Sequence, residues 1–223
     1  MTALIVTANG LVGRERELTE PEHLALRSYG ADSTFFHAIA QGRTEALSHN
    51  PDFGAFSSVA RTKRDAIDAV FSISRLLTAQ TLWSGQGHGW GVRGALDGAP
   101  ANFVGQQYRY PGYISTSTDR SWCDAFLDKR NRSQSRPTML EFRLPAGTPA
   151  IDMHDGGAQG EFEILLPRER LFSITDAKML PGDLLQLVPR LLGVLGGLLR
   201  RLDVGAGLFG CGVGGVGQAA QKI

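Results

Sequence analysis

The chain has 223 residues, with 23 Lys and Arg against 22 Asp and Glu, and 28 glycines. This balanced charge argues against nucleic acid as a partner, because nucleic-acid binders usually carry a clear basic excess. The length is sufficient for a hydrophobic core without a structural metal, and Cys123 and Cys211 form no zinc-ligand pattern, so we expect no metal site. No apolar stretch reaches the roughly 20 residues of a membrane span, and residues 1–12 lack the basic start of a secretory signal peptide.

The first predicted elements are helices. Thr19, Pro21 and Glu22 have the spacing of a helix N-cap, a helix-start proline and a capping-box acid. A second helix is expected over residues 33–40. A third is expected over residues 64–79, where apolar residues recur every three or four positions.

Short strands with tight turns follow the helices. A glycine-rich loop, residues 85–91, comes after the first strand, and a short helix is expected over residues 121–127. Helices followed by short strands predict an α+β domain. The predicted strands are residues 81–83, 108–117, 139–144, 161–166 and 171–180.

The chain is expected to consist of three parts: an N-terminal extension (1–17), a domain (18–180) and a tail (181–223). Leucines at helical spacing over residues 188–202 predict an amphipathic helix, and the glycine-rich remainder is expected to lack fixed structure. Such a helix can lie on a membrane surface or pack against the domain or a partner. The glycines within it favour packing over membrane contact.

Two glutamates stand two positions apart in the segment Gly160–Pro167. On a strand, Glu161 and Glu163 point to the same side. Adjacent carboxylates raise each other's pKa, and such a pair can stabilise a developing positive charge and hold a cationic nucleophile. Taken alone, the pair also agrees with an ordinary solvent-facing strand edge.

The hydroxyl run Ser115-Thr116-Ser117 lies about 45 residues earlier. Its hydroxyls can orient a neighbouring carboxylate, although a polar strand face would look the same.

The order of these motifs resembles the mono-ADP-ribosyltransferases, and more narrowly their arginine-specific branch of bacterial toxins and type III effectors. The resemblance covers residues 18–180. It rests on the first helices, an aromatic-X-Gly strand, an aromatic-X-Ser-Thr-Ser strand and Glu-X-Glu followed by Leu-Leu-Pro. It implies an ADP-ribosyltransferase-like fold, with N-terminal helices and two small antiparallel sheets flanking an NAD cleft.

The resemblance also implies roles for individual residues. Glu163 would be the catalytic glutamate, which stabilises the oxocarbenium-like transition state, and Ser115 would orient it. Glu161 goes with arginine as the acceptor, and His154, in an acceptor-facing loop over residues 152–160, would contact the substrate. The expected NAD-contacting residues are Trp83, Ser84, Gly85, Thr116 and Ser117.

One position departs from the family motif. The family has aromatic-Arg-Gly where this chain has Trp83-Ser84-Gly85, and serine cannot replace the guanidinium that holds the cofactor's phosphate and ribose side. Losing charge-assisted hydrogen bonds of roughly 1.5–3 kcal/mol each would weaken NAD binding about tenfold to a hundredfold or more. Either another arginine fills the gap, or the two glutamates capture an arginine-bearing peptide without NAD. The candidate arginines are Arg75, Arg93 and Arg109.

The leading hypothesis is an NAD-dependent mono-ADP-ribosyltransferase that modifies arginine on a host target protein, with NAD as co-substrate and no metal. The alternatives are a catalytically impaired module that binds arginine-containing peptide, and an NAD hydrolase without a protein acceptor. The family branch and the predominance of arginine over lysine favour a secreted bacterial effector acting inside a host cell, with the bacterial cytoplasm as the alternative location.

Overall fold

The computed structural model describes residues 3–31, 33, 36, 53–86, 99–130, 137–156 and 162–192. Residues 1–192 form one compact unit, to which all elements below belong, and residues 193–223 are assigned to a second. The second predicted helix (33–40) lies almost wholly outside the described residues. No helix in the described ranges is long and apolar enough to cross a membrane.

The N-terminal residues form part of a small sheet. Strands β1 (Ile5–Val6), β2 (Val12–Arg14) and β3 (Ser74–Leu76) pair in that order, all antiparallel. Val12 is fully buried in the core. The segment expected to be an extension is therefore packed into the compact unit.

Helix α1 (Glu20–Ala31) begins as its capping sequence predicts. The Thr19 N–H donates to Glu22 Oε2 at 2.7 Å, which is the reciprocal bond of a capping box. Arg16 adds two hydrogen bonds to the same carboxylate, at 2.7 and 2.8 Å. Chiefly through the Arg16 bonds, the pKa of Glu22 falls from its ordinary value of 4.5 to about 2.

Helix α3 (Phe53–Ile73) lies earlier in the chain than the predicted residues 64–79. Its apolar spacing was correctly recognised, because Ile67, Val70 and Phe71 are all buried. The helix ends at Ile73 because the next three residues pair with β2 as strand β3. Helical periodicity in the sequence did not reveal that pairing.

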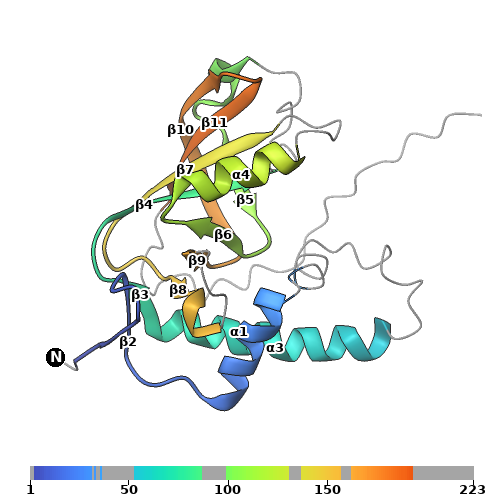
Figure 1. The fold of residues 1–223 in the computed structure, drawn as a ribbon, viewed down its shortest axis with the longest axis vertical. Coiled ribbons are helices and arrows are strands. Elements are labelled where there is room, and N and C mark those ends of the chain that lie inside the picture. Colours follow the sequence, from blue (N-terminus) through green and yellow to red (C-terminus); the bar gives the residue numbers. More distant parts are fainter. Residues whose placement is uncertain are drawn as a thin grey trace, which may run out of the picture. The chain divides into compact units, whose positions relative to one another are not determined.

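The second sheet has eight strands, in the order β5-β10-β11-β7-β4-β6-β9-β8 (Figure 1). Every neighbouring pair is antiparallel except β7 and β11, which are parallel. Helix α4 (Arg120–Arg130) and the 3-10 turns η2 (Pro100–Phe103) and η3 (Met153–Gly156) connect its strands. The strands are β4 (Gln80–Gln86), β5 (Gln107–Tyr110), β6 (Ile114–Ser117), β7 (Thr138–Leu144), β8 (Ile151–Asp152), β9 (Glu163–Leu166), β10 (Arg170–Leu180) and β11 (Leu184–Leu191).

The predicted α+β class is confirmed, but the sheet extends beyond the expected domain end at residue 180. Strand β11 lies between β10 and β7, and Leu185 and Leu187 are fully buried. Residues 188–191, predicted to begin an amphipathic helix, are part of this strand. A leucine-rich run agrees with a helix or with a strand buried on both faces, and pairing on both sides decides for the strand. The rest of the predicted helix lies outside the described residues.

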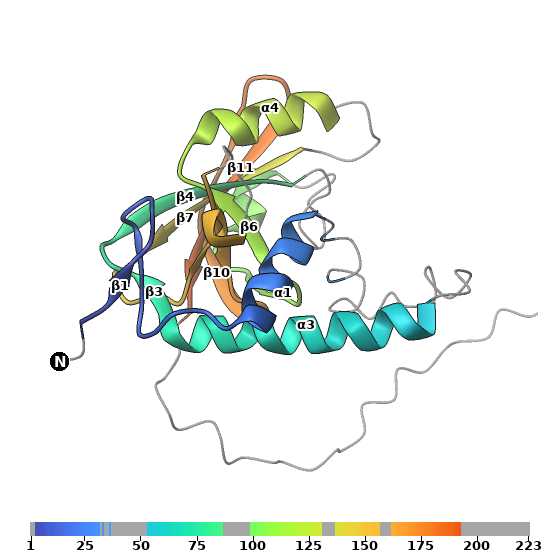
Figure 2. The same cartoon turned by 60° about the horizontal axis from the view of Figure 1, so that its bottom comes forward.

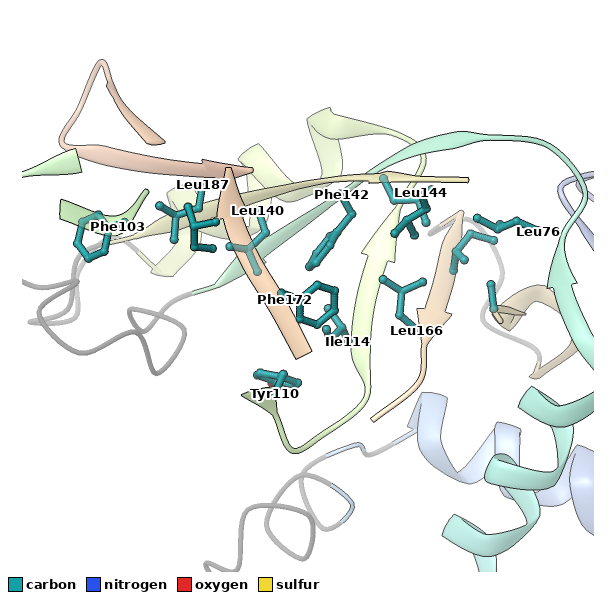
Figure 3. Close-up of a cluster of buried hydrophobic side chains, with 14 of the residues drawn as sticks. Leu76, Phe103, Tyr110, Ile114, Leu140, Phe142, Leu144, Leu166, Phe172 and Leu187 are labelled. Carbon is teal, nitrogen blue, oxygen red and sulfur yellow. The ribbon is translucent and has the colours of Figure 1, made fainter. Parts of the chain in front are cut away.

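Two hydrophobic clusters fix the central strands. One lies within the eight-stranded sheet and includes Ile114, Leu166 and the tilted ring pair Phe142–Phe172, whose centroids are 5.4 Å apart (Figure 3). The other joins Leu165 of β9 to side chains of α1 and α3. Figure 2 shows strands of the sheet between α4 and the α1–α3 pair. Strands β6 and β9 are thus held from both faces where they carry the hydroxyl run and the glutamate.

Candidate active site

A cleft of about 530 Å³ lies where α1, β4, β6, β9 and α4 meet. Most of the residues predicted from the sequence line it: Ser84, Gly85, Ser115, Thr116, Ser117 and Glu163. Residues from three distant parts of the chain therefore share one cavity. Glu161 and Arg93 lie outside the described residues.

Strand register sets the row of side chains around Glu163. Ser117 lies directly opposite Glu163, and Trp83 lies directly opposite Ser117. Directly opposed residues share a face of the sheet, so these three side chains form a row across β9, β6 and β4. Ser115 is on the same face two residues earlier, opposite Leu165. Ser117 is thus the nearer hydroxyl to Glu163 in register, and the orienting role of Ser115 stays a prediction.

The backbone is strained immediately before the glutamate. Phe162 has φ of 45°, a left-handed conformation that costs a non-glycine residue about 1–3 kcal/mol. Its carbonyl accepts a hydrogen bond from the Thr118 N–H at 3.4 Å, and its side chain is 55% exposed. The strain sits at the point where the chain enters β9 with Glu163 as the first strand residue.

Helix α1 contributes Tyr29, which the sequence did not identify as a site residue. The ring is buried and meets Tyr113 edge-on, with centroids 5.6 Å apart. Its hydroxyl shares a hydrogen bond with Ser115 Oγ at 3.3 Å. Burial raises the pKa of Tyr29 above its ordinary value of 10, so the phenol stays neutral. Only the tertiary packing of α1 against α3 and η3 brings this residue to the cleft.

A second set of contacts ties α3 to both functional strands. Tyr113, just before β6, donates its hydroxyl to Asp68 Oδ1 at 2.8 Å. Arg168, just after β9, donates to Asp68 Oδ2 through Nε at 3.0 Å and Nη2 at 2.7 Å. One carboxylate on α3 therefore fixes the start of the Ser-Thr-Ser strand and the end of the Glu163 strand.

Ser84, where the sequence resemblance led us to expect an arginine, has a hydroxyl that is engaged within the protein. It donates to the Ser115 carbonyl at 2.7 Å and accepts from Gln86 Nε2 at 2.8 Å. Among the described residues that line the cleft there is no lysine or arginine. Two of the candidate replacements are paired elsewhere, Arg75 with Glu15 and Arg109 with Glu169.

Comparison with known proteins identifies the fold. Residues 92–186 match the family model described as ADP-ribosyltransferase exoenzyme. The crystal structure of the Clostridium limosum C3 exoenzyme aligns with a TM-score of 0.60 at 20% identity, covering 79% of this chain and 87% of that one. The fold is that of the ADP-ribosyltransferase toxins.

Two further toxin structures were solved with small molecules. C3stau2 from S. aureus with NAD aligns with a TM-score of 0.56 at 16% identity, covering 79% of this chain and 88% of that one. Vis, from Vibrio splendidus, in complex with agmatine aligns at 0.54 and 16% identity, covering 79% and 76%. No curated protein sequence matches significantly.

Within this toxin fold, two predicted site residues lie outside the cleft lining. Trp83 packs with Cys123, Leu127 and Met139 beneath α4. His154 is exposed on η3, where its backbone N–H donates to Asp152 Oδ1 at 3.0 Å. Both residues were assigned to the site by the resemblance, and their roles stay predictions.

Gly85 has a packing role in the same toxin fold. A Cβ atom there would lie 3.1 Å from the Cys123 carbonyl oxygen and 3.1 Å from Leu127 Cγ. This contact is tighter than side chains normally tolerate, so glycine allows α4 to approach β4. The close approach forms the α4 wall of the cleft.

Proposed function

We propose that the protein is an NAD-dependent mono-ADP-ribosyltransferase that modifies arginine on a target protein. The observation that carries the proposal is the position of Glu163 on the cleft, in a row with Ser117 and beside Ser115, within the fold of the ADP-ribosyltransferase toxins. The family match over residues 92–186 includes both motifs and supports the same activity.

The chemistry assigned to the cleft is electrostatic stabilisation by a fixed carboxylate. NAD supplies the ADP-ribosyl group and leaves nicotinamide behind. Glu163 is placed to stabilise the positive charge that develops on the ribose as this bond breaks. In the proposal, Ser115 and Ser117 hold its carboxylate in position. The proposal is supported by the strand register and by the hydrogen bond that the buried Tyr29 makes to Ser115. The acceptor nitrogen then forms the new bond and releases a proton to solvent.

Arginine as the acceptor follows from Glu161 together with Glu163. A carboxylate binds a guanidinium through two parallel hydrogen bonds. The structure of Vis with agmatine, which carries a guanidinium, supports this choice in a related fold. In the proposal Glu161 binds the acceptor arginine of a host protein, and the exposed His154 contacts the same acceptor.

The test is NAD cleavage and agmatine modification by the wild type and two variants. Glu163→Gln is expected to reduce both reactions by about 10²–10³-fold. Glu161→Gln is expected to lose transfer to agmatine while retaining release of nicotinamide. Glu17→Gln, at a side chain that is 76% exposed, is the matched control and should behave like the wild type. A wild-type protein that neither binds nor cleaves NAD would exclude the proposal.

The second candidate function is a catalytically impaired module that binds arginine-containing peptide without NAD. It is favoured by Ser84 and by the lack of a cation among the described cleft-lining residues. It predicts peptide binding that depends on Glu161 or Glu163 and is insensitive to NAD. Competition between NAD and the peptide would contradict it.

The proposed setting is a secreted bacterial effector that acts inside a host cell. The toxin fold supports this over the bacterial cytoplasm. Partners would be host proteins with an exposed arginine, and contact with membranes through the tail is not favoured.

A further inference from the structure

The described lining of the candidate cleft offers no side-chain cation to the phosphates of a dinucleotide. Its described lining combines aromatic rings, hydroxyls and the Glu163 carboxylate, without lysine or arginine. The two phosphates of NAD are anionic, and a site that holds them normally provides a guanidinium or an ammonium group. If the proposed function is correct, the cation comes from a residue outside this described lining.

Most arginines close to the functional strands already have acid partners. Arg168 binds Asp68, Arg109 binds Glu169 at 2.7 Å, and Arg75 binds Glu15. To bind a phosphate, each of these guanidiniums would have to share or give up the carboxylate that it already binds. These residues are therefore poor substitutes for the arginine absent at position 84.

Arg170 differs from these arginines. It is the first residue of β10, it is partly buried, and it has no hydrogen-bond or ion-pair partner within the described part of the chain. Burial lowers its pKa below the ordinary value of 12.5. Partial burial of a cation without an acceptor is unfavourable, so this residue costs the unliganded protein stability.

Strand register places Arg170 beside the cleft. It lies directly opposite Tyr110 of β5, which is a cleft-lining residue. Opposed residues share a face of the sheet, with Cβ atoms about 4.5–5.5 Å apart. Figure 3 shows Tyr110 at the edge of the hydrophobic cluster, beyond Phe172 and Ile114, and Tyr110 is also a lining residue of the cleft.

We propose that Arg170 supplies the guanidinium that binds a phosphate of the dinucleotide, replacing the arginine missing at position 84. This inference rests on the proposed function, because it assumes that NAD enters the cleft. It assigns the phosphate side of the ligand to the β5–β10 edge and the reacting ribose to the β6–β9 edge, where Glu163 lies. The ligand's phosphate would provide the acceptor that Arg170 lacks in the free protein.

The test is calorimetric binding of NAD, ADP-ribose and the phosphate-free nicotinamide riboside to the full chain. Arg170→Met should weaken binding of NAD and ADP-ribose about 10- to 100-fold, as expected for lost charge-assisted hydrogen bonds. Binding of the riboside should not change. Arg170→Lys should recover part of the loss, because it keeps the charge but not the fork. Arg190→Met, at an exposed residue of neighbouring strand β11, is the matched control and should bind all ligands like the wild type.

Thermal unfolding of the free proteins separates a ligand role from a structural one. Because Arg170 is uncompensated, Arg170→Met should unfold at the same temperature as the wild type or at a higher one. A lower unfolding temperature with equal loss of all three ligands would overturn the proposal in favour of a structural role. NAD binding at wild-type affinity by Arg170→Met would overturn this inference alone. Failure of the wild type to bind NAD or ADP-ribose would overturn the proposed function as well.

Discussion

Asp68 offers the sharpest test of how α3 supports the site. Its carboxylate accepts the Tyr113 hydroxyl at 2.8 Å and two Arg168 nitrogens at 3.0 and 2.7 Å. The Asp68 and Arg168 side chains are 33% and 28% exposed, so solvent screens part of this interaction. Allowing for that screening, we expect Asp68→Asn to lower the free energy of unfolding by about 2–3 kcal/mol.

The assay is urea unfolding, followed by NAD cleavage under native conditions. Asp65→Asn, on the same helix, is the matched control, because Asp65 also pairs with an arginine but is 65% exposed. Its expected cost is about 0–0.5 kcal/mol. Since Asp68 fixes the strands that carry Ser115 and Glu163, NAD cleavage should fall in Asp68→Asn and not in the control. Equal stability and activity of the two variants would refute the view that this carboxylate holds the site.

Three further predictions concern stability and packing. The lowered pKa of Glu22, about 2 against an ordinary 4.5, stabilises the fold by about 1–3 kcal/mol, because solvent screens its 45% exposed partner Arg16. This stability is present above pH ~4.5 and is lost as the pH falls towards 2. The free energy of unfolding of Glu22→Gln, measured in urea, should therefore be lower than that of the wild type at pH 7 and equal to it near pH 2. Glu20→Gln is the exposed control. A difference that stays the same at both pH values would refute the assignment. Gly85→Ala should lower the free energy of unfolding by about 1–3 kcal/mol and reduce NAD cleavage, because its Cβ would press on Cys123 and Leu127 of α4. A variant as stable as the wild type would contradict this packing role. Ser84→Ala should lower the free energy of unfolding by about 1 kcal/mol, because it removes the hydrogen bond to the Ser115 carbonyl. An unchanged free energy of unfolding would mean that this hydrogen bond contributes nothing to stability.

Local signals in the sequence predicted much of the fold. The capping box at Thr19 and Glu22 gave the start of α1, and alternation over residues 139–144 gave β7. These features depend on neighbours close in sequence. Strands β1, β2 and β11 were missed because their conformation depends on pairing with distant segments. For β11 the leucine spacing suggested a helix. The segment is a strand buried on both faces, and such a strand is also rich in leucine.

The candidate site, like the fold, was predictable where the signal is local and not where it depends on distant residues. Ser115, Ser117 and Glu163 could be grouped because their motifs have a recognisable order, and the structure brings them to one cleft. The supporting residues carried no local signal. Tyr29 reaches Ser115 across 86 positions, and Arg168 reaches Asp68 across 100. Sequence reasoning therefore identified residues that line the cleft but not the contacts that hold them in place.

Release of nicotinamide from NAD tests the central claim most directly. The account predicts that the wild type cleaves NAD, and that Glu163→Gln lowers kcat by about 10²–10³-fold while still binding NAD, because the carboxylate acts on charge that develops only as the bond breaks. Glu17→Gln should match the wild type. Equal cleavage by Glu163→Gln and the wild type would contradict the catalytic assignment of this cleft.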